Sequence, residues 1–116
     1  MKAILLVSHG SQSSNTCAEV ERLVKILKVK SKISVFEYAF LEILSPPILE
    51  GIDRCVKKGA TEIVILLNFL NAGKHVDEDI PRIVEEAKVK HPQIKFRITK
   101  PVGQHEGIVR VFLDLI

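Results

Sequence analysis

The feature that most constrains this chain is a regular alternation of short apolar runs with amphipathic segments. The runs, rich in Val and Ile as β-strands are, cover about residues 2–8, 33–40, 62–68 and 94–99. Apolar residues recur every three or four positions, as in helices, over about residues 16–30, 46–58, 77–90 and 105–115. Such alternation predicts a parallel sheet with right-handed crossovers and helices on both faces.

Four strands connected in this way predict a flavodoxin-like, three-layer αβα sandwich. We expect one α/β domain over residues 1–116 and a parallel sheet of strand order 2-1-3-4. The third run is continuously apolar, which indicates a strand near the centre of the sheet. Ligands bind such sheets at the carboxyl ends of the strands, and the crevice of this topology falls between strands one and three.

Several local signals predict where the helices begin, end and pack. Ser45 followed by Pro46 is typical of a helix start, with Ser45 as the N-cap and Pro46 at the first helical position. Gly59 is expected to end that helix. The last helix is expected to pack its apolar residues on the core: these are Ile108, Val109, Val111, Phe112 and Leu115. His91, before Pro92, is expected at the surface.

The composition limits which kinds of molecule the chain is expected to bind and in which cellular compartment it is expected to work. The chain is 47% hydrophobic and 27% charged, without Trp, which fits a globular domain and not a base-stacking nucleic-acid surface. A net charge of +3 permits an anionic small-molecule partner. Cys17 and Cys55 lie in no metal or disulfide pattern, and no apolar run reaches membrane length. We expect a soluble, cytoplasmic protein that binds neither nucleic acid nor membrane.

Two histidines follow strands that flank the predicted crevice. His9 ends the first strand region and His75 follows the third, after an Asn/Gly loop. Each alone is as compatible with a helix-capping role as with function. Together, two neutral imidazoles that converge on a cleft favour a divalent ion such as Co²⁺, Ni²⁺, Fe²⁺ or Zn²⁺. Two imidazoles leave coordination positions open, which suits a metal in transit more than a structural metal.

Carboxylates near the same strand ends have two interpretations. Glu42, after the second strand, is placed to bind metal or accept a proton, but it also suits the positive end of a helix. For Asp77, Glu78 and Asp79 we favour the helix-end interpretation. A separate hypothesis is an anion or nucleotide site in the polar loop at residues 11–15.

A set of motifs resembles the sirohydrochlorin chelatases of the class II chelatase superfamily, in their small single-domain form. The motifs, in order, are Ser8-His9-Gly10-Ser11, Ala39-Phe40-Leu41-Glu42, Pro47 with Ile52-Asp53, Asn71-Ala72-Gly73-Lys74-His75-Val76, and Asp79-Ile80-Pro81. The match runs from Ile4 to about Gly103. In that family a histidine, a glutamate and a histidine after the first three strands surround the inserted metal. They correspond to His9, Glu42 and His75, separated by two intervals of 33 residues.

The resemblance implies a lyase that inserts Co²⁺, Ni²⁺ or Fe²⁺ into sirohydrochlorin without ATP, on the path to cobalamin, sirohaem or coenzyme F430. Cobalt is the first candidate, and no permanently bound cofactor is expected. His9 and His75 are predicted to present metal and accept protons, with Glu42 assisting. Substrate binding is assigned to Ser11, Gln12, Asn71, Gly73 and Lys74, and Arg82 or Lys100 are further candidates to meet the substrate's carboxylates.

Two positions depart from the family pattern, and two further hypotheses remain open. Many relatives carry Arg at the positions of Gln12 and Lys74, so the grip on substrate carboxylates differs, because Lys lacks the bidentate fork of Arg. One four-stranded domain can cover only one side of a macrocycle. We therefore predict a homodimer, in which a second copy covers the other side. The alternative function is a metal-binding or metal-delivery module without turnover.

Overall fold

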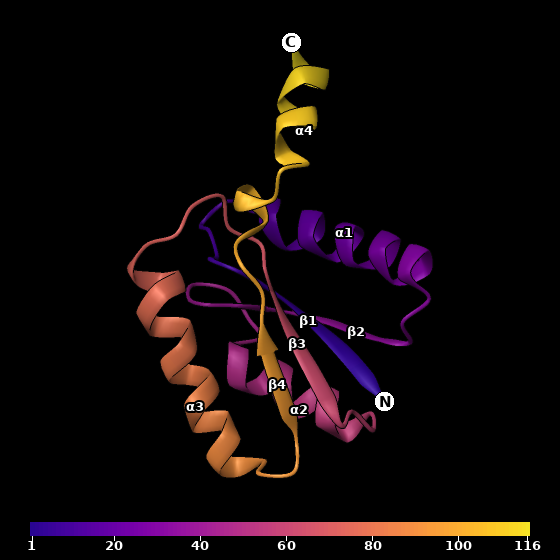
Figure 1. Ribbon diagram of the computed structural model, residues 1–116, viewed down its shortest axis with the longest axis vertical. Coiled ribbons are helices and arrows are strands. Elements are labelled where there is room, and N and C mark those ends of the chain that lie inside the picture. The colour runs from indigo at the N-terminus through magenta and orange to yellow at the C-terminus, as the bar shows by residue number, and fades with distance from the viewer.

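A computed structural model describes residues 1–116 as one α/β sandwich (Figure 1). The strands are β1 (Lys2–Ser8), β2 (Val35–Phe40), β3 (Glu62–Leu67) and β4 (Lys95–Ile98). The helices are α1 (Thr16–Ser31), α2 (Ile48–Lys57), α3 (Ile80–Lys90) and α4 (Ile108–Leu115), with a π-helical turn η1 (His75–Asp79) and a 3₁₀ turn η2 (Val102–Gln104). All strand pairs are parallel and their order is β2-β1-β3-β4, which confirms the predicted fold and topology.

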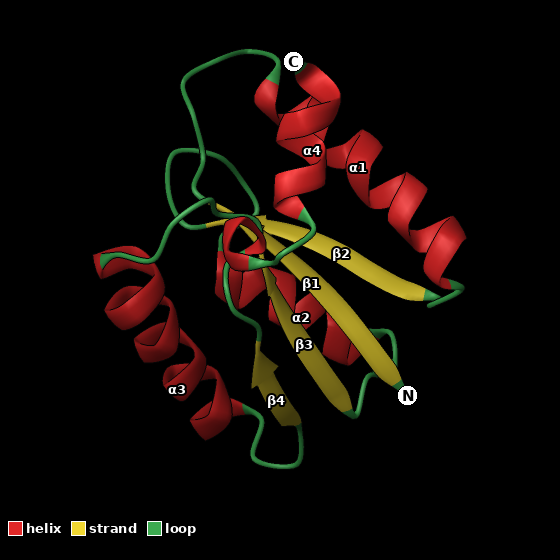
Figure 2. Ribbon diagram, turned by 45° about the horizontal axis from the view of Figure 1, so that its top comes forward, coloured by secondary structure: helices red, strands yellow, loops and turns green.

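The sheet lies between α1 on one face and α2 and α3 on the other (Figure 2), and it divides the core into two clusters. Alternate residues of β1, among them Leu5 and Val7, pack with α2 and α3 in the larger cluster of 16 buried residues. The intervening residues Ile4 and Leu6 pack with α1 in a smaller cluster of seven. Side chains of successive strand residues point to opposite faces, so β1 is apolar throughout because both of its faces are covered.

The predicted start of α2 is wrong by two residues. The helix begins at Ile48, and its N-cap is Pro47, in an extended conformation without a side-chain cap. The Phe40 N–H donates to the Pro46 carbonyl at 2.9 Å, so Pro46 continues the sheet instead of opening the helix. Gly59, with a φ of +98°, does lie just beyond the end of α2.

The predicted packing of α4 is also wrong. The helix forms at the expected residues but stands away from the sheet and the other helices (Figure 1). None of its residues is buried, and Phe112 is 59% and Leu115 79% exposed. The apolar pattern predicted a buried helix, but spacing indicates only that a helix has an apolar face and not which surface covers it. No helix of the structure is long and apolar enough to cross a membrane.

His91 connects two helices instead of lying free at the surface. Its Nε2 lies 2.8 Å from Asp53 Oδ1, while Lys90 Nζ lies 2.9 Å from the other oxygen. The His91 side chain is only 14% exposed. Asp53 thereby links α2 to the end of α3, and hydrogen bonds from Lys90 and His91 hold the pKa of its carboxyl group below the usual range.

We expect Asp53→Asn to lower the free energy of unfolding by about 1 kcal/mol at pH 7, the upper range for exposed ion pairs. A carboxyl pKa that is lower in the folded chain stabilises above the unfolded pKa, and this contribution is lost as the pH falls through the folded pKa. The difference between wild type and variant in urea denaturation should therefore shrink below about pH 4. Glu50→Gln is the matched control, since Glu50 pairs with Arg54 in an exposed position of the same helix. Equal losses in both variants would contradict a specific role of Asp53.

Candidate functional site

The structure brings His9, Glu42 and His75 together at the carboxyl edge of the sheet. His9 Nε2 lies 2.7 Å and His75 Nε2 lies 3.8 Å from the same oxygen, Glu42 Oε1. The three ligand atoms lie within 4.8 Å of one another. The side chains are 44%, 49% and 46% exposed, respectively, so the cluster is open to solvent. Each residue follows a different strand, β1, β2 and β3, as the topology predicts.

Backbone contacts fix the relative positions of His9 and Glu42. The Leu41 N–H donates to the Ser8 carbonyl at 2.8 Å, and the Glu42 N–H donates to the His9 carbonyl at 3.0 Å. Gly10 has a φ of +105°, and a Cβ there would overlap the Glu42 carbonyl oxygen. Only glycine combines this conformation with so close an approach. The loops after β1 and β2 are therefore locked together at the site.

His75 is oriented by Asp79, one helical turn further along η1. Its Nδ1–H donates to Asp79 Oδ2 at 2.7 Å, and this hydrogen bond lowers the pKa of the Asp79 carboxyl group. Because a carboxylate only accepts, Nδ1 carries a proton, and Nε2 is the ring nitrogen left on the side of Glu42, 3.8 Å from its Oε1. Our helix-end interpretation of Asp79 missed this contact. The spacing of four residues between His75 and Asp79 is the sequence signal that indicates it.

The backbone places an acceptor beside His9 as well. Its Nδ1 lies 3.1 Å from the Gly10 carbonyl oxygen, which only accepts, so Nδ1 carries a proton here too. Its Nε2 lies 2.7 Å from Glu42 Oε1, a carboxylate oxygen that also only accepts. Two acceptors at this separation repel unless a proton or a metal ion lies between them. The site is thus built to hold a positive charge.

The donor set fits a divalent transition metal. Imidazole nitrogen and carboxylate oxygen bind such ions at about 2.0–2.2 Å, so ligand atoms opposite each other lie about 4.0–4.4 Å apart. The observed spacing, all within 4.8 Å, needs only small side-chain rotations to reach this range. Two imidazoles and one carboxylate fill three positions and leave others open for a second molecule that binds the metal.

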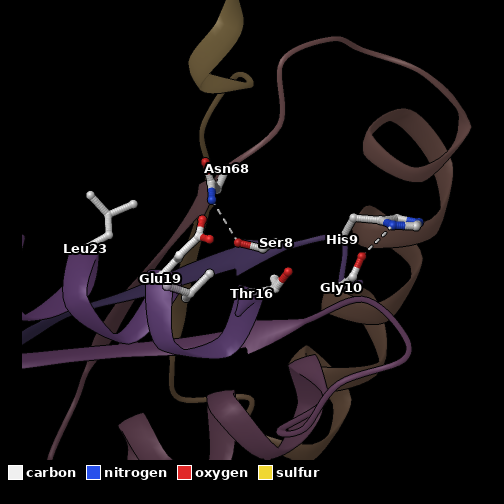
Figure 3. A pocket seen from close by; sticks show the side chains of 8 residues that line it. Ser8, His9, Gly10, Thr16, Glu19, Leu23 and Asn68 are labelled. Atoms are coloured by element: carbon white, nitrogen blue, oxygen red, sulfur yellow. Dashed lines mark hydrogen bonds between the residues drawn. The ribbon is translucent and has the colours of Figure 1, made fainter. Parts of the chain in front are cut away.

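Hollows flank the cluster on both faces of the sheet. On the α1 side, a hollow of about 340 Å³ is lined by Ser8, His9, Thr16, Glu19 and Asn68, among others (Figure 3). In it, Asn68 Nδ2–H donates to Ser8 Oγ at 2.9 Å. The hollow of about 240 Å³ on the α3 side is lined by Leu41, Glu42, His75, Asp79, Arg82 and Ile83. The three ligands therefore form a ridge between two recesses.

The residues assigned to substrate binding lie on the loops around this ridge. Ser11 and Gln12 follow β1, and Asn71, Gly73 and Lys74 precede η1; all but Ser11 are exposed. Arg82 lines the α3-side hollow and contacts Asp79 Oδ1 at 3.5 Å, whereas Lys100 lines a separate hollow beside β4. Sequence analysis did not single out Glu19 or Asn68, because a lone polar residue at a helix or strand end carries no distinctive pattern.

Comparisons with known proteins agree on one family. The CbiX family model matches residues 3–116. The chain is 33% identical over 113 residues to the chloroplastic sirohydrochlorin ferrochelatase of Arabidopsis thaliana, covering 97% of this chain and 50% of that protein. It is 32% identical over 114 residues to the sirohydrochlorin cobaltochelatase of Sulfolobus acidocaldarius, covering 98% of this chain and 89% of that protein.

A solved structure supports the same relationship. The sirohydrochlorin chelatase SirB from Bacillus subtilis subspecies spizizenii, in complex with cobalt, superposes with a TM-score of 0.90 at 33% identity. The match covers 97% of this chain and 48% of that one. The chain thus spans about half the length, or less, of the first relatives that it matches, at 50%, 44%, 42% and 36%.

We expect Asp79→Asn to weaken Co²⁺ binding about 10- to 100-fold, the usual effect of losing the carboxylate behind a metal-binding imidazole. Titration calorimetry at pH 7.5 measures the dissociation constant. Asp77→Asn is the matched control, since Asp77 is exposed on the same turn and makes no side-chain contact with the cluster. His9→Ala and His75→Ala should weaken binding further because each removes a ligand. Unchanged affinity in Asp79→Asn would contradict its role in orienting His75.

Proposed function

Because the chain belongs to the CbiX family, we propose that it is a metal chelatase, a lyase that inserts a divalent metal into sirohydrochlorin without ATP. The observation that carries the proposal is the open cluster of His9, Glu42 and His75. Relatives named as ferrochelatases and cobaltochelatases support this chemistry. Co²⁺ is the first candidate for the metal, with Fe²⁺ and Ni²⁺ as the alternatives, since imidazole and carboxylate bind all three.

In the proposed reaction, the imidazoles act first as ligands and then as bases. Insertion transfers the metal ion to four ring nitrogens and releases two pyrrole N–H protons. As the ion leaves, the Nε2 lone pairs of His9 and His75 become free beside the ring, and each accepts one of those protons. Glu42 Oε1, 2.7 Å and 3.8 Å from the two nitrogens, stabilises the imidazolium ions that form.

The substrate's carboxylates require a cationic rim. Lys74 is next to His75 in the sequence, and Arg82 lines the α3-side hollow together with Glu42 and His75. Ser11, Gln12, Asn71 and Gly73 supply hydroxyl, amide and backbone donors on the same loops. We assign the macrocycle's acidic groups to this rim, with Lys74 acting as a point charge instead of a bidentate fork.

We also propose that the working form is a homodimer. The ligands stand on an open ridge about half exposed to solvent, so one domain covers a macrocycle on one side only. Several relatives contain about as much chain again as this one. A second copy supplies a comparable wall and shields the reacting ring from water.

The proposal is tested with purified protein, sirohydrochlorin and Co²⁺, Fe²⁺ or Ni²⁺ under anaerobic conditions, by following the absorbance change of metallation. We expect a rate well above the spontaneous reaction, and a loss of about 100-fold or more in His9→Ala and in His75→Ala, as for removal of an acid–base group. Glu50→Gln is the control, because Glu50 is exposed on α2, pairs with Arg54 and lines neither hollow at the ligand cluster. Tight metal binding without acceleration would instead identify a metal-delivery module, and full activity in both alanine variants would contradict the assigned site.

A further inference from the structure

The strand ends that carry the three ligands are joined unequally. The loop after β2 donates a backbone hydrogen bond to the His9 carbonyl at 3.0 Å, one residue beyond the end of β1. On the other side of β1, the last backbone hydrogen bond runs from the Asn68 N–H to the Val7 carbonyl, at 2.9 Å. No backbone hydrogen bond joins residues 9–15, after β1, to residues 69–79, which contain the second histidine. The position of one histidine relative to the other therefore depends on side chains.

One side-chain hydrogen bond continues the pairing of β1 with β3. Asn68 Nδ2–H donates to Ser8 Oγ at 2.9 Å (Figure 3). Ser8 is 6% exposed and is the only polar residue among the 27 buried residues of the chain. Its carbonyl also accepts the Leu41 N–H at 2.8 Å, so Ser8 is bonded to the β2 side through its backbone and to the β3 side through its hydroxyl. The residue before His9 thus connects three strand ends.

This hydrogen bond lies where the two histidine segments leave the sheet. Ser8 directly precedes His9, and Asn68 is the first residue after β3 on the path to His75. The two imidazole rings are in contact, with centroids 4.9 Å apart and planes tilted by 48°. A metal ion binds each nitrogen at about 2.0–2.1 Å, so a shift of one strand end decides whether a single ion reaches both rings.

We propose that Ser8 and Asn68 are positioning residues for the metal site, whose hydrogen bond sets the separation of His9 and His75 so that one divalent ion binds both. The two side chains act through the backbone of the segments that carry the histidines. Ligands held in place before binding lose less conformational freedom when the ion arrives, which strengthens binding. This inference rests on the proposed function only in taking the cluster of His9, Glu42 and His75 as the metal site.

The first test is the Co²⁺ dissociation constant of the full chain, measured by titration calorimetry without a tetrapyrrole. We expect Ser8→Ala and Asn68→Ala each to weaken binding about 5- to 10-fold, the effect of one lost hydrogen bond behind the ligands. The double variant should bind as each single variant does, because all three lack the same bond. Thr16→Val is the matched control, since Thr16 lines the same hollow from α1, and its affinity should equal that of the wild type.

The second test restores the hydrogen bond with a different partner. In Asn68→Asp the Ser8 hydroxyl can donate to the new carboxylate, so this variant should bind Co²⁺ at least as tightly as the wild type. The variant Ser8→Ala with Asn68→Asp carries the same charge without the hydrogen bond, and its affinity should be about 5- to 10-fold below that of Asn68→Asp. The visible absorption spectrum of bound Co²⁺ reports coordination geometry, and it should change in Asn68→Ala but not in Asn68→Asp.

Circular dichroism and urea denaturation verify that each variant is folded. A lower stability of Asn68→Ala with unchanged Co²⁺ affinity and spectrum would show that the hydrogen bond only stabilises the sheet, and this would overturn the proposal. Additive losses in the double alanine variant, or binding by Asn68→Asp as weak as that by Asn68→Ala, would overturn it too. Because no sirohydrochlorin is present, the outcome is separate from that of the metallation assay. A chain that shows these effects but does not metallate the ring keeps the positioning role and loses the proposed function.

Discussion

The ligand cluster depends on the parallel pairing of β1 with β2, which continues beyond the last residues of both strands. The Leu41 and Glu42 N–H groups donate to the Ser8 and His9 carbonyls, extending the ladder that pairs Ser8 with Phe40. Gly10 then lets the β1 loop turn away while touching the Glu42 carbonyl. The hydrogen-bond register that pairs β1 with β2 therefore also positions His9 and Glu42. No additional structural element is needed to bring their side chains together.

This placement brings the His9 and His75 rings against the Glu42 carboxylate, and the charge balance among the three groups is related to their exposure to solvent. Backbone and carboxylate acceptors place protons on Nδ1 of His9 and His75, and both Nε2 atoms lie within 3.8 Å of Glu42 Oε1, an arrangement that is repulsive when Nε2 carries no proton. A bound proton or metal ion relieves the repulsion, and the two compete for the same lone pairs. A buried site of this composition would retain its ion, whereas side chains about half exposed to water allow exchange. This openness supports the proposal that the same atoms release a metal and take up protons in its place.

Much of this architecture follows from the sequence because strand ends are set by periodicity and topology. The four apolar runs and their connections predict the observed strand order, and that order brings His9, Glu42 and His75 to one edge. The start of α2 was mispredicted because the Pro46 carbonyl is used by Phe40, a contact between segments that no local signal encodes. The role of Asp79 was missed because a carboxylate near a helix start has a sufficient local explanation. The four-residue spacing from His75 to Asp79 carried the signal for their contact, which lies within the turn η1.

Helix α4 shows that apolar periodicity predicts a helix but not the surface on which the helix packs. The apolar spacing predicted its boundaries, because helical periodicity is local, but packing requires a second surface that periodicity does not identify. In the structure its apolar side chains stay exposed, and hydrogen bonds from Gly103 to Phe69 and from Ile108 to His105 set the direction in which the chain leaves the sheet. The spacing of apolar residues thus specifies a helix and its apolar face, while contacts between distant segments decide where that face points.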